Sequence, residues 1–318
     1  MLKRKALRKI IITTFSFLIV FVICIIPEKI NSNKDYLNPN INVEYVSNLG
    51  TNEIYLLGPN NYLVKTNILL EEDNLNSKIR GIINYLTVQK NDKIPTGLSG
   101  IIPTNTKLNN IELKDKVATL DFSEELLNTT LELEERVIEA ITYSVINLNE
   151  VAGVTIKING NILSELPKAK KKIPEVITRD FGINKVFDID NLNGIQKVTL
   201  YYLDKISNNN YYVPVTKYLN DDREKINIII DNLSSNYIYE SSLVSLLNQD
   251  TQLINYELQD EIMTLNFNQS IFTNNKLLEE VTYTVAESVC DTYKVKSVIF
   301  QVNGEALYTT NQCYNENK

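Results

Sequence analysis

Two stretches of alternating hydrophobic and polar residues stand out along the chain. Residues 106–122 read TKLNNIELKDKVATLDF, residues 251–267 read TQLINYELQDEIMTLNF, and nine of the 17 aligned positions are identical. Alternation of this kind predicts β-strands, and the polar residues around Asp115 and Asp260 predict the tight turn of a β-hairpin in each stretch. The identities indicate an internal duplication, so the chain contains two repeats.

Helical spacing precedes each hairpin. Four apolar residues at positions i, i+3, i+4 and i+7 predict an amphipathic helix in both repeats. They are Ile79, Ile82, Ile83 and Leu86 in the first repeat and Ile226, Ile229, Ile230 and Leu233 in the second.

A second helix is predicted after each hairpin, over about residues 131–148 and 276–290. The two helices align through ITYSV at 141–145 and VTYTV at 281–285. A stripe of apolar residues that begins at Val137 should be buried, and the charged residues on the other side of the first helix should face water.

The fold expected for each repeat is α+β, with the order β-β-α-β-β-α-β. Asn159-Gly160 and Asn303-Gly304 are strong hairpin signals and predict one more short strand at each end. We expect two tandem homologous modules, each a small separate sheet with both helices packed on one face. The predicted domain bounds are 51–165 and 195–310, followed by a tail over 311–318.

Residues 166–194 are expected to link the two domains. Lys168, Lys170, Lys171 and Lys172 form a basic cluster there, which is typical of a solvated linker. Pro167 and Pro174 should stiffen this segment.

The N-terminal region predicts attachment to a membrane. Five basic residues precede an uncharged run over residues 10–26, so residues 1–27 are expected to form a cytoplasmic end and a transmembrane anchor. Residues 28–50 would form a tether, and the remainder would lie outside the cell membrane. A cleaved signal peptide and a lipoprotein attached through Cys24 stay open as alternatives.

Composition limits the classes of function. The 318 residues include no histidine or tryptophan, and 32 basic against 39 acidic residues give a net charge of −7. An acidic body offers no footprint for nucleic acid. Three cysteines are too few for a disulfide framework, but Cys290 and Cys313 would both lie outside the membrane. These two residues form either a disulfide or two free thiols.

No catalytic constellation is evident in the sequence. Asp121 and Ser123 lie at a strand end beside Glu124-Glu125, and paired carboxylates could serve a hydrolase. The alternative is that Asp121 or Ser123 caps the following turn. The second repeat has Asn266 and Asn268 at these positions, which favours the structural role. We therefore expect no enzyme, no cofactor and no metal site.

Tyrosine pairs raise a different possibility. Tyr201-Tyr202 and Tyr211-Tyr212 flank the first hairpin of the second repeat, and aromatic platforms bind glycans. Alternation along a strand should place one tyrosine of each pair in the core and the other outside. A peptidoglycan-binding module is therefore the alternative function.

Several weak motifs occur in the same order in both repeats and together resemble the GerMN domain family. In the first repeat they are Ile102–Thr106 in a loop, Val117–Ser123 at a strand end, Thr142–Ser144 in a helix and Thr155–Gly160 in the last strand. The resemblance covers residues 51–310. GerMN domains are in turn similar to the ring-building modules of secretion and sporulation channels. The resemblance implies modules that pack side by side.

The function implied by this resemblance is a non-enzymatic role in sporulation or germination. Such a protein would help an envelope complex between mother cell and forespore to assemble or stay in place. Its expected partners are other envelope or sporulation proteins, with the membrane bound through the N-terminal helix. The candidate interaction surface is the outer face of the helix over 131–148, at Glu132, Glu135 and Glu139, together with free edge strands.

Overall fold

The computed structural model describes residues 51–310 and Cys313, apart from residues 71, 73, 90–92, 208 and 236–241. The predicted anchor over 1–27, the tether over 28–50 and most of the predicted tail lie outside the described residues. No helix among the described residues is long and apolar enough to cross a membrane. The described residues, which include both repeats, belong to one compact unit.

Each repeat has the order of strands and helices that the sequence predicts. The first repeat consists of β1 (Thr51–Leu57), β2 (Leu63–Leu69), α2 (Leu75–Leu86), β3 (Leu108–Lys114), β4 (Val117–Phe122), α3 (Leu131–Ile146), β5 (Gly153–Ile158) and β6 (Asn161–Ile162). The second consists of β8 (Ile195–Ile206), β9 (Asn209–Asn220), α4 (Lys225–Ser234), β10 (Leu253–Gln259), β11 (Ile262–Phe267), α5 (Glu279–Tyr293), β12 (Ser297–Val302) and β13 (Glu305–Thr309). Short 3₁₀ turns, η1 (Glu124–Leu127) and η3 (Gln269–Ile271), precede α3 and α5.

The predicted hairpins and their tight turns are confirmed. β3 pairs with β4 and β10 pairs with β11, both antiparallel and in matching registers. Asp115 and Lys116 have φ angles of 50° and 62°, and Asp260 and Glu261 have 49° and 62°. Two successive positive φ angles define a type I′ turn, whose twist matches that of the flanking strands.

Each repeat builds a four-stranded sheet whose inner face is covered by helices. The strand orders are β3-β4-β5-β6 and β10-β11-β12-β13, and the two central strands of each sheet are parallel. Leu120 and Phe122 in β4, and Leu265 and Phe267 in β11, are fully buried. Alternate residues of these strands therefore form the core, as the period of two predicts.

The first hairpins depart from the expected arrangement. β1-β2 and β8-β9 join neither four-stranded sheet. Together with β7 (Val186–Asp188) they form one five-stranded sheet, in which β2 pairs with β9. The expectation of a separate sheet for each repeat is therefore wrong.

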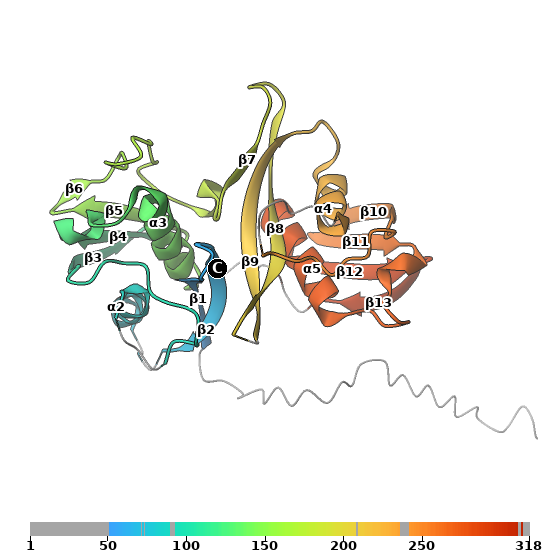
Figure 1. Ribbon diagram of the computed structural model, residues 1–318, viewed down its shortest axis with the longest axis horizontal. Coiled ribbons are helices and arrows are strands. Elements are labelled where there is room, and N and C mark those ends of the chain that lie inside the picture. Colours follow the sequence, from blue (N-terminus) through green and yellow to red (C-terminus); the bar gives the residue numbers. More distant parts are fainter. Residues whose placement is uncertain are drawn as a thin grey trace, which may run out of the picture. The chain divides into compact units, whose positions relative to one another are not determined.

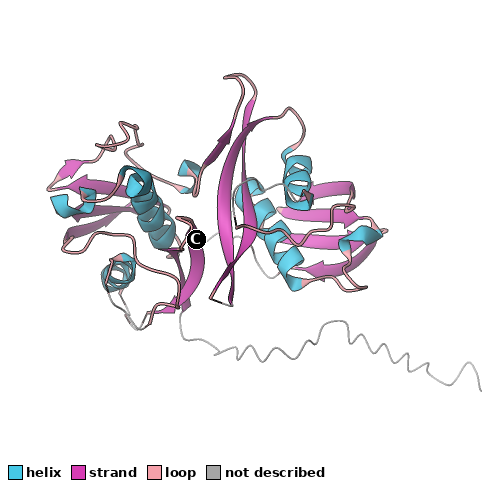
Figure 2. Cartoon of the chain, viewed as in Figure 1, coloured by secondary structure: helices cyan, strands magenta, loops and turns pink. Residues whose placement is uncertain are grey.

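The position of the helices explains this departure. α3 contacts both β1 and β5, and α5 contacts both β8 and β12, so the helices lie between the hairpin and the four-stranded sheet of their own repeat (Figure 1, Figure 2). The hairpins are thereby held away from those sheets. Their edges are left to pair with each other across the two repeats.

The segment between the repeats is only partly solvated: Lys168, Lys170 and Lys172 are exposed as predicted, whereas other residues pack against the repeats. Leu166, Ile177 and Ile183 are buried, and Ile177 pairs with Val154 of β5. A 3₁₀ turn, η2 (Arg179–Phe181), follows, and β7 then pairs in parallel with β9. Lys171 of the basic cluster is half-buried and pairs with Glu135 on α3.

Candidate functional site: a charged cavity between the repeats

The two repeats meet along β2 and β9, where Lys65 is opposite Tyr212. Beyond this position, the side chain of Asn184 from the linker fills the gap between the strands. Its Oδ1 accepts a hydrogen bond from Leu63 N at 2.8 Å, and its Nδ2 donates to the carbonyl oxygens of Leu63 and Pro214 at 2.8 and 2.7 Å. Asn184 is fully buried and thus connects the two hairpins inside the core.

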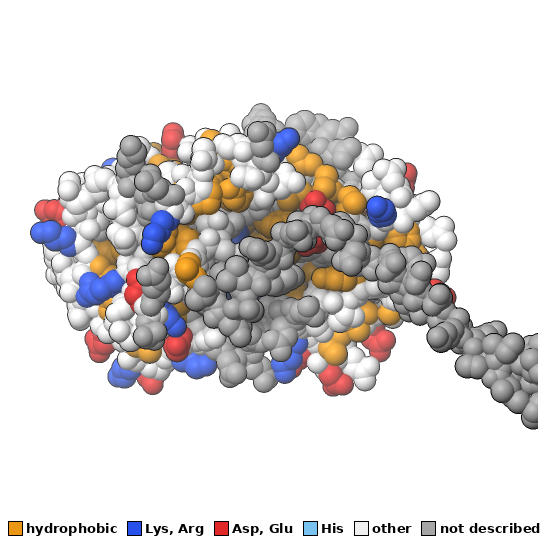
Figure 3. Space-filling view, turned by 90° about the horizontal axis from the view of Figure 1, so that it is seen from below, with side chains coloured by type: hydrophobic (Ala, Val, Ile, Leu, Met, Phe, Trp, Pro, Cys, Tyr) orange, Lys and Arg blue, Asp and Glu red, His pale blue; other side chains and the backbone are white. Residues whose placement is uncertain are grey.

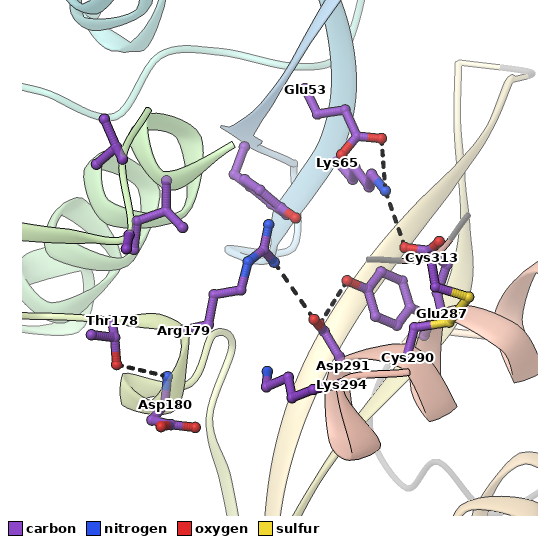
Figure 4. A pocket seen from close by; sticks show the side chains of 15 residues that line it. Glu53, Lys65, Thr178, Arg179, Asp180, Glu287, Cys290, Asp291, Lys294 and Cys313 are labelled. Carbon is purple, nitrogen blue, oxygen red and sulfur yellow. Dashed lines mark hydrogen bonds and ion pairs between the residues drawn. A yellow bond between two sulfur atoms is a disulfide. The ribbon is translucent and has the colours of Figure 1, made fainter. Parts of the chain in front are cut away.

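A cavity of about 230 Å³ lies beside this junction, bordered by both repeats and by the linker. Most of its charged lining residues come from β1, β2, η2 and α5. Figure 4 shows Lys65 between Glu53 and Glu287, and Arg179 reaching toward Asp291. The remaining charged lining residues are Asp180 and Lys294.

Lys65 connects the two repeats electrostatically. Its Nζ lies 2.9 Å from Glu53 in the first repeat and 3.2 Å from Glu287 on α5 of the second. Burial acts to lower the pKa of Lys65, but the carboxylates of Glu287 and Glu53 outweigh burial and raise that pKa well above its usual value. Burial, opposed by Lys65, raises the pKa of Glu287. The ammonium therefore stays charged and is shared by two carboxylates.

Arg179 of η2 makes the second connection. Its guanidinium donates to the side chain of Asn147 at the end of α3 and lies 3.6 Å from the Asp291 carboxylate on α5. The Tyr201 hydroxyl donates to Asp291 at 2.8 Å, and the Tyr143 hydroxyl donates to the carbonyl of Arg179 at 2.8 Å. Burial acts to lower the pKa of Arg179, but Asp291 outweighs it and raises that pKa.

The contacts of Arg179 fall on equivalent positions of the two repeats. Ser144 Oγ accepts from Tyr55 N at 3.0 Å on β1, and Ser288 Oγ accepts from Tyr201 N at 2.9 Å on β8. Because Asn147 follows Ser144 by one turn as Asp291 follows Ser288, these two residues correspond as well. The expected alignment of ITYSV with VTYTV is therefore wrong by one helical turn.

The predicted interaction surface on α3 is largely covered. Glu132 is exposed, but Glu135 binds Lys171 at 2.7 Å and Lys185 at 2.6 Å, and Glu139 is fully buried. This part of the prediction is wrong because the linker, expected in solvent, packs on that face of the helix.

The buried carboxylate of Glu139 holds the linker in place. It accepts from Asn184 N at 2.9 Å and pairs with Arg136 at 2.8 Å. Burial raises the pKa of Glu139 even though Arg136 and Lys185 oppose this effect. Nearby, the carboxylate of Glu134 accepts from the backbone N–H groups of Lys168 and Ala169, so part of the basic cluster is anchored to α3.

The roles of Asp121 and Ser123 are structural. Asp121 Oδ1 accepts from Gly160 N at 2.8 Å, and Asn266 Oδ1 accepts from Gly304 N at 3.0 Å. Ser123 Oγ accepts from Lys107 N at 2.9 Å, and Asn268 Oδ1 accepts from Gln252 N at 3.1 Å. The second repeat thus keeps both hydrogen bonds with different side chains. These hydrogen bonds hold neighbouring loops in place. The expected cap is absent, because the Ser123 side chain makes no capping hydrogen bond to the following 3₁₀ turn.

Cys290 and Cys313 form a disulfide, with the two Cα atoms 5.6 Å apart. Of the two alternatives left open by the sequence, the structure shows the pair. Cys313 N also donates to the carbonyl of Lys296 at 2.7 Å. Both cysteines border the cavity. Cys290 lies one turn beyond Glu287 on α5, so the bond holds Cys313 beside the contact between the repeats.

Of the two tyrosine pairs, Tyr201-Tyr202 forms no exposed platform, and Tyr211-Tyr212 is half-buried. Tyr201 and Tyr202 are both buried, because β8 packs against helices and also lies at the contact between the repeats. The expected alternation of inside and outside is therefore wrong for this pair. Tyr212 stacks on Tyr283 of α5 with ring centroids 3.8 Å apart.

The residues that form this site carried no distinctive signal in the sequence. Lys65, Arg179 and Asn184 are single polar residues in stretches without a motif. Only the fold brings them together. Among the described residues, no group of three or more histidine, cysteine or acidic side chains could hold a metal ion.

Comparison with known proteins assigns this architecture to a family. The family model described as "Germane: Sporulation and spore germination" matches residues 53–164 and 199–308. The chain belongs to this family, and the resemblance to GerMN domains inferred from the sequence is confirmed. The family description connects the chain with sporulation and spore germination.

Two relatives show how far the similarity extends. The chain is 29% identical over 264 residues to the spore germination protein GerM of Bacillus subtilis (strain 168). This alignment covers 80% of the chain and 72% of GerM. The solved structure of the tandem GerMN domains of the sporulation protein GerM from Bacillus subtilis matches with a TM-score of 0.76 at 27% identity. That match covers 84% of this chain and 99% of the solved one.

Proposed function

We propose that the protein is a non-enzymatic scaffold outside the cell membrane that supports a sporulation complex between mother cell and forespore. The N-terminal segment would anchor it in the membrane, as a single helix or through a lipid. Its partners would be other envelope or sporulation proteins. Membership of the Germane family and the likeness to GerM support the link to sporulation.

The observation that carries the scaffold proposal is the contact between the repeats. Lys65, Arg179 and Asn184 each bind residues of both repeats, and all three contacts lie inside the molecule. The two modules are therefore fixed to each other, as a scaffold that holds partners in one geometry requires. A hinged pair of modules would not transmit a fixed geometry to its partners.

The charged groups of the cavity favour this structural role over catalysis. Lys65, Arg179, Glu287 and Asp291 satisfy one another through the ion pairs given above. A catalytic acid or base needs access to a substrate proton, whereas these groups are engaged across a domain contact. Structural ion-pair networks perturb pKa values as catalytic sites do.

The face drawn in Figure 3 gives little support for nucleic acid as a partner. The face drawn in Figure 3 carries basic and acidic side chains interspersed among hydrophobic ones. A nucleic-acid site needs a patch of one sign. The glycan-binding alternative loses its expected platform, because Tyr201 and Tyr202 are buried.

A genetic complementation experiment tests the proposal. Loss of the gene should lower the yield of heat-resistant spores, and the full chain should restore that yield. The purified ectodomain should remain in solution when isolated cell-wall sacculi are sedimented. Unchanged spore yield in the deletion strain would contradict the proposed role, and co-sedimentation with sacculi would favour the peptidoglycan alternative.

A further inference from the structure

An ordered loop presents hydrophobic side chains to solvent at one end of the central sheet. Residues 189–194 connect β7 to β8, which lie on opposite sides of β9. The loop therefore crosses the end of β9 at Asn220, and it forms the upper tip of this group of strands in Figure 1. Leu192 in the loop is 86% exposed, and Phe187 beside it on β7 is 55% exposed. Ile195 pairs with Asn220, on the face of the sheet that also carries Tyr218 and Phe187, whereas Val186 pairs with Lys217 and faces the other side.

The loop is held in one conformation by side-chain hydrogen bonds, most of them made by Asn220, and Asn191 Oδ1 also accepts from Asn193 N at 2.9 Å. Asn220 Oδ1 accepts from the backbone N–H groups of Asp190 and Asn191 at 2.7 and 3.2 Å, and its Nδ2 donates to the carbonyls of Asn191 and Asn193 at 3.1 and 2.7 Å. Phe187 is likewise fixed, because it stacks on Tyr218 with ring centroids 4.9 Å apart. Leu192 is thus displayed on a preorganised loop, which lowers the entropic cost of docking.

Single exposed apolar residues are common on protein surfaces, but a contiguous group is less so. Here Phe187 on β7 and Ile195 at the start of β8 share one face, and the exposed Leu192 lies on the loop between them. Large apolar anchors on a preorganised support are typical of the centre of a protein interface.

The charges around this surface indicate the chemistry of the partner. Asp188 pairs with Lys217 at 2.9 Å, and Asp221 pairs with Arg223 at 2.8 Å. Asp190 in the loop and Asp222, two residues beyond Asn220, are exposed and form no ion pair with any described residue. These two carboxylates lie in the loop and just beyond the end of β9, while Lys171, whose Nζ lies 5.2 Å from the Phe187 ring centroid, is paired with Glu135 at 2.7 Å. Negative charge opposes contact with anionic lipid and favours a basic protein surface.

We propose that this tip, formed by Phe187, Asp190, Leu192, Ile195 and Asp222, docks into an apolar pocket bordered by lysine or arginine on a partner protein. The proposal rests on the proposed function in that the partner would belong to the sporulation complex. This tip takes the place of the α3 face as the candidate interaction surface, because the linker covers much of the α3 face and the tip is exposed.

Site-specific crosslinking in sporulating cells tests the proposal. A photoreactive benzoylphenylalanine at position 192 of the full chain should form an adduct with one other protein, at an apolar site bordered by lysine or arginine. The same probe at Leu131, an exposed leucine at the start of α3, serves as the matched control. Asp190→Lys should lower the adduct yield at least tenfold, whereas Glu132→Lys should not change it. An adduct with lipid or with a second copy of the chain, no adduct, or full yield with Asp190→Lys would overturn the proposal.

Spore yield separates failure of this surface from failure of the proposed function. Leu192→Ser should lower spore yield toward that of the deletion strain, and Leu131→Ser should not, with the unfolding midpoint unchanged for both exposed positions. If deletion lowers spore yield but Leu192→Ser does not, and no adduct forms, the surface is wrong and the function stands. If the adduct forms as expected while deletion leaves spore yield unchanged, the proposed function fails and the surface stands.

Discussion

The side chain of Asn184 pairs with the backbone of Leu63 as a neighbouring strand would, accepting from its N–H and donating to its carbonyl at 2.8 Å each. The same amide also reaches Pro214 on β9. A residue of the linker therefore extends the hydrogen bonding of the shared sheet where β2 and β9 diverge. It does so with a φ angle of 48°, a conformation that asparagine tolerates better than most residues.

Removal of this amide should destabilise the protein. Asn184→Ala leaves the buried N–H and carbonyl of Leu63 without partners, and each such group costs about 1–3 kcal/mol. We expect a loss of about 3 kcal/mol in the free energy of unfolding, measured by urea denaturation. Asn184→Gly is the matched control for backbone strain and should lose nearly as much. Stability close to that of the wild type in the glycine variant would show that the amide contributes little.

Lys65 should be coupled energetically to Glu287. Lys65→Met leaves the buried Glu287 carboxylate without its cation, and breaking a buried pair in this way costs about 3–5 kcal/mol. Adding Glu287→Gln should recover part of that loss, since the uncompensated charge is removed. A double-mutant cycle measures the coupling, and additive effects of the two substitutions would contradict the pairing across the repeats.

Glu135 should make stability depend on pH. Burial acts to raise the pKa of Glu135, but hydrogen bonds from Lys171 and Lys185 outweigh it and lower that pKa. A lowered folded-state pKa stabilises the protein above the unfolded value of about 4.5, and the contribution is lost as pH falls through the folded value.

The matched substitutions Glu135→Gln and Glu132→Gln test this dependence. Glu135→Gln should flatten the fall in unfolding free energy between about pH 5 and pH 3. Glu132→Gln, at an exposed position on the same helix, should leave that slope unchanged. Equal slopes for the wild type and Glu135→Gln would contradict the role of the two lysines.

The Cys290–Cys313 bond should stabilise the second repeat. Closing a loop over a sequence separation of 23 residues contributes about 3 kcal/mol in the chain-entropy model. Cys290→Ser, Cys313→Ser and reduction of the wild type should each lower the unfolding free energy by that order. Thiol titration of the unreduced protein under denaturing conditions checks the bond directly, and two reactive thiols from this pair would contradict it.

The sequence predicted the local elements well because their signals are local. The apolar spacing of Ile79, Ile82, Ile83 and Leu86 needs only one buried face, and all four residues are buried in α2. The turns at Asp115 and Asp260 depend on two residues each. The pairing of Cys290 with Cys313 could be posed as one of two outcomes, since few cysteines are present.

The contact between the repeats could not be predicted in the same way. β2 and β9 pair at one position, Lys65 with Tyr212, and no periodic pattern marks a strand edge that meets a distant strand. Lys168, Lys170 and Lys172 are exposed as predicted, but charge alone could not show that Lys171 pairs with Glu135 on α3. The helix alignment slipped by one turn because apolar residues recur every three or four positions in both helices.

Differential scanning calorimetry of residues 48–318 tests the central claim most directly, since it asks whether the two repeats form one cooperative unit. The account predicts a single transition whose calorimetric enthalpy equals its van't Hoff enthalpy, and Lys65→Met should move that whole transition to lower temperature. Two resolved transitions in the wild type, one for each repeat and neither shifted by Lys65→Met, would contradict the claim that these modules act as one rigid scaffold.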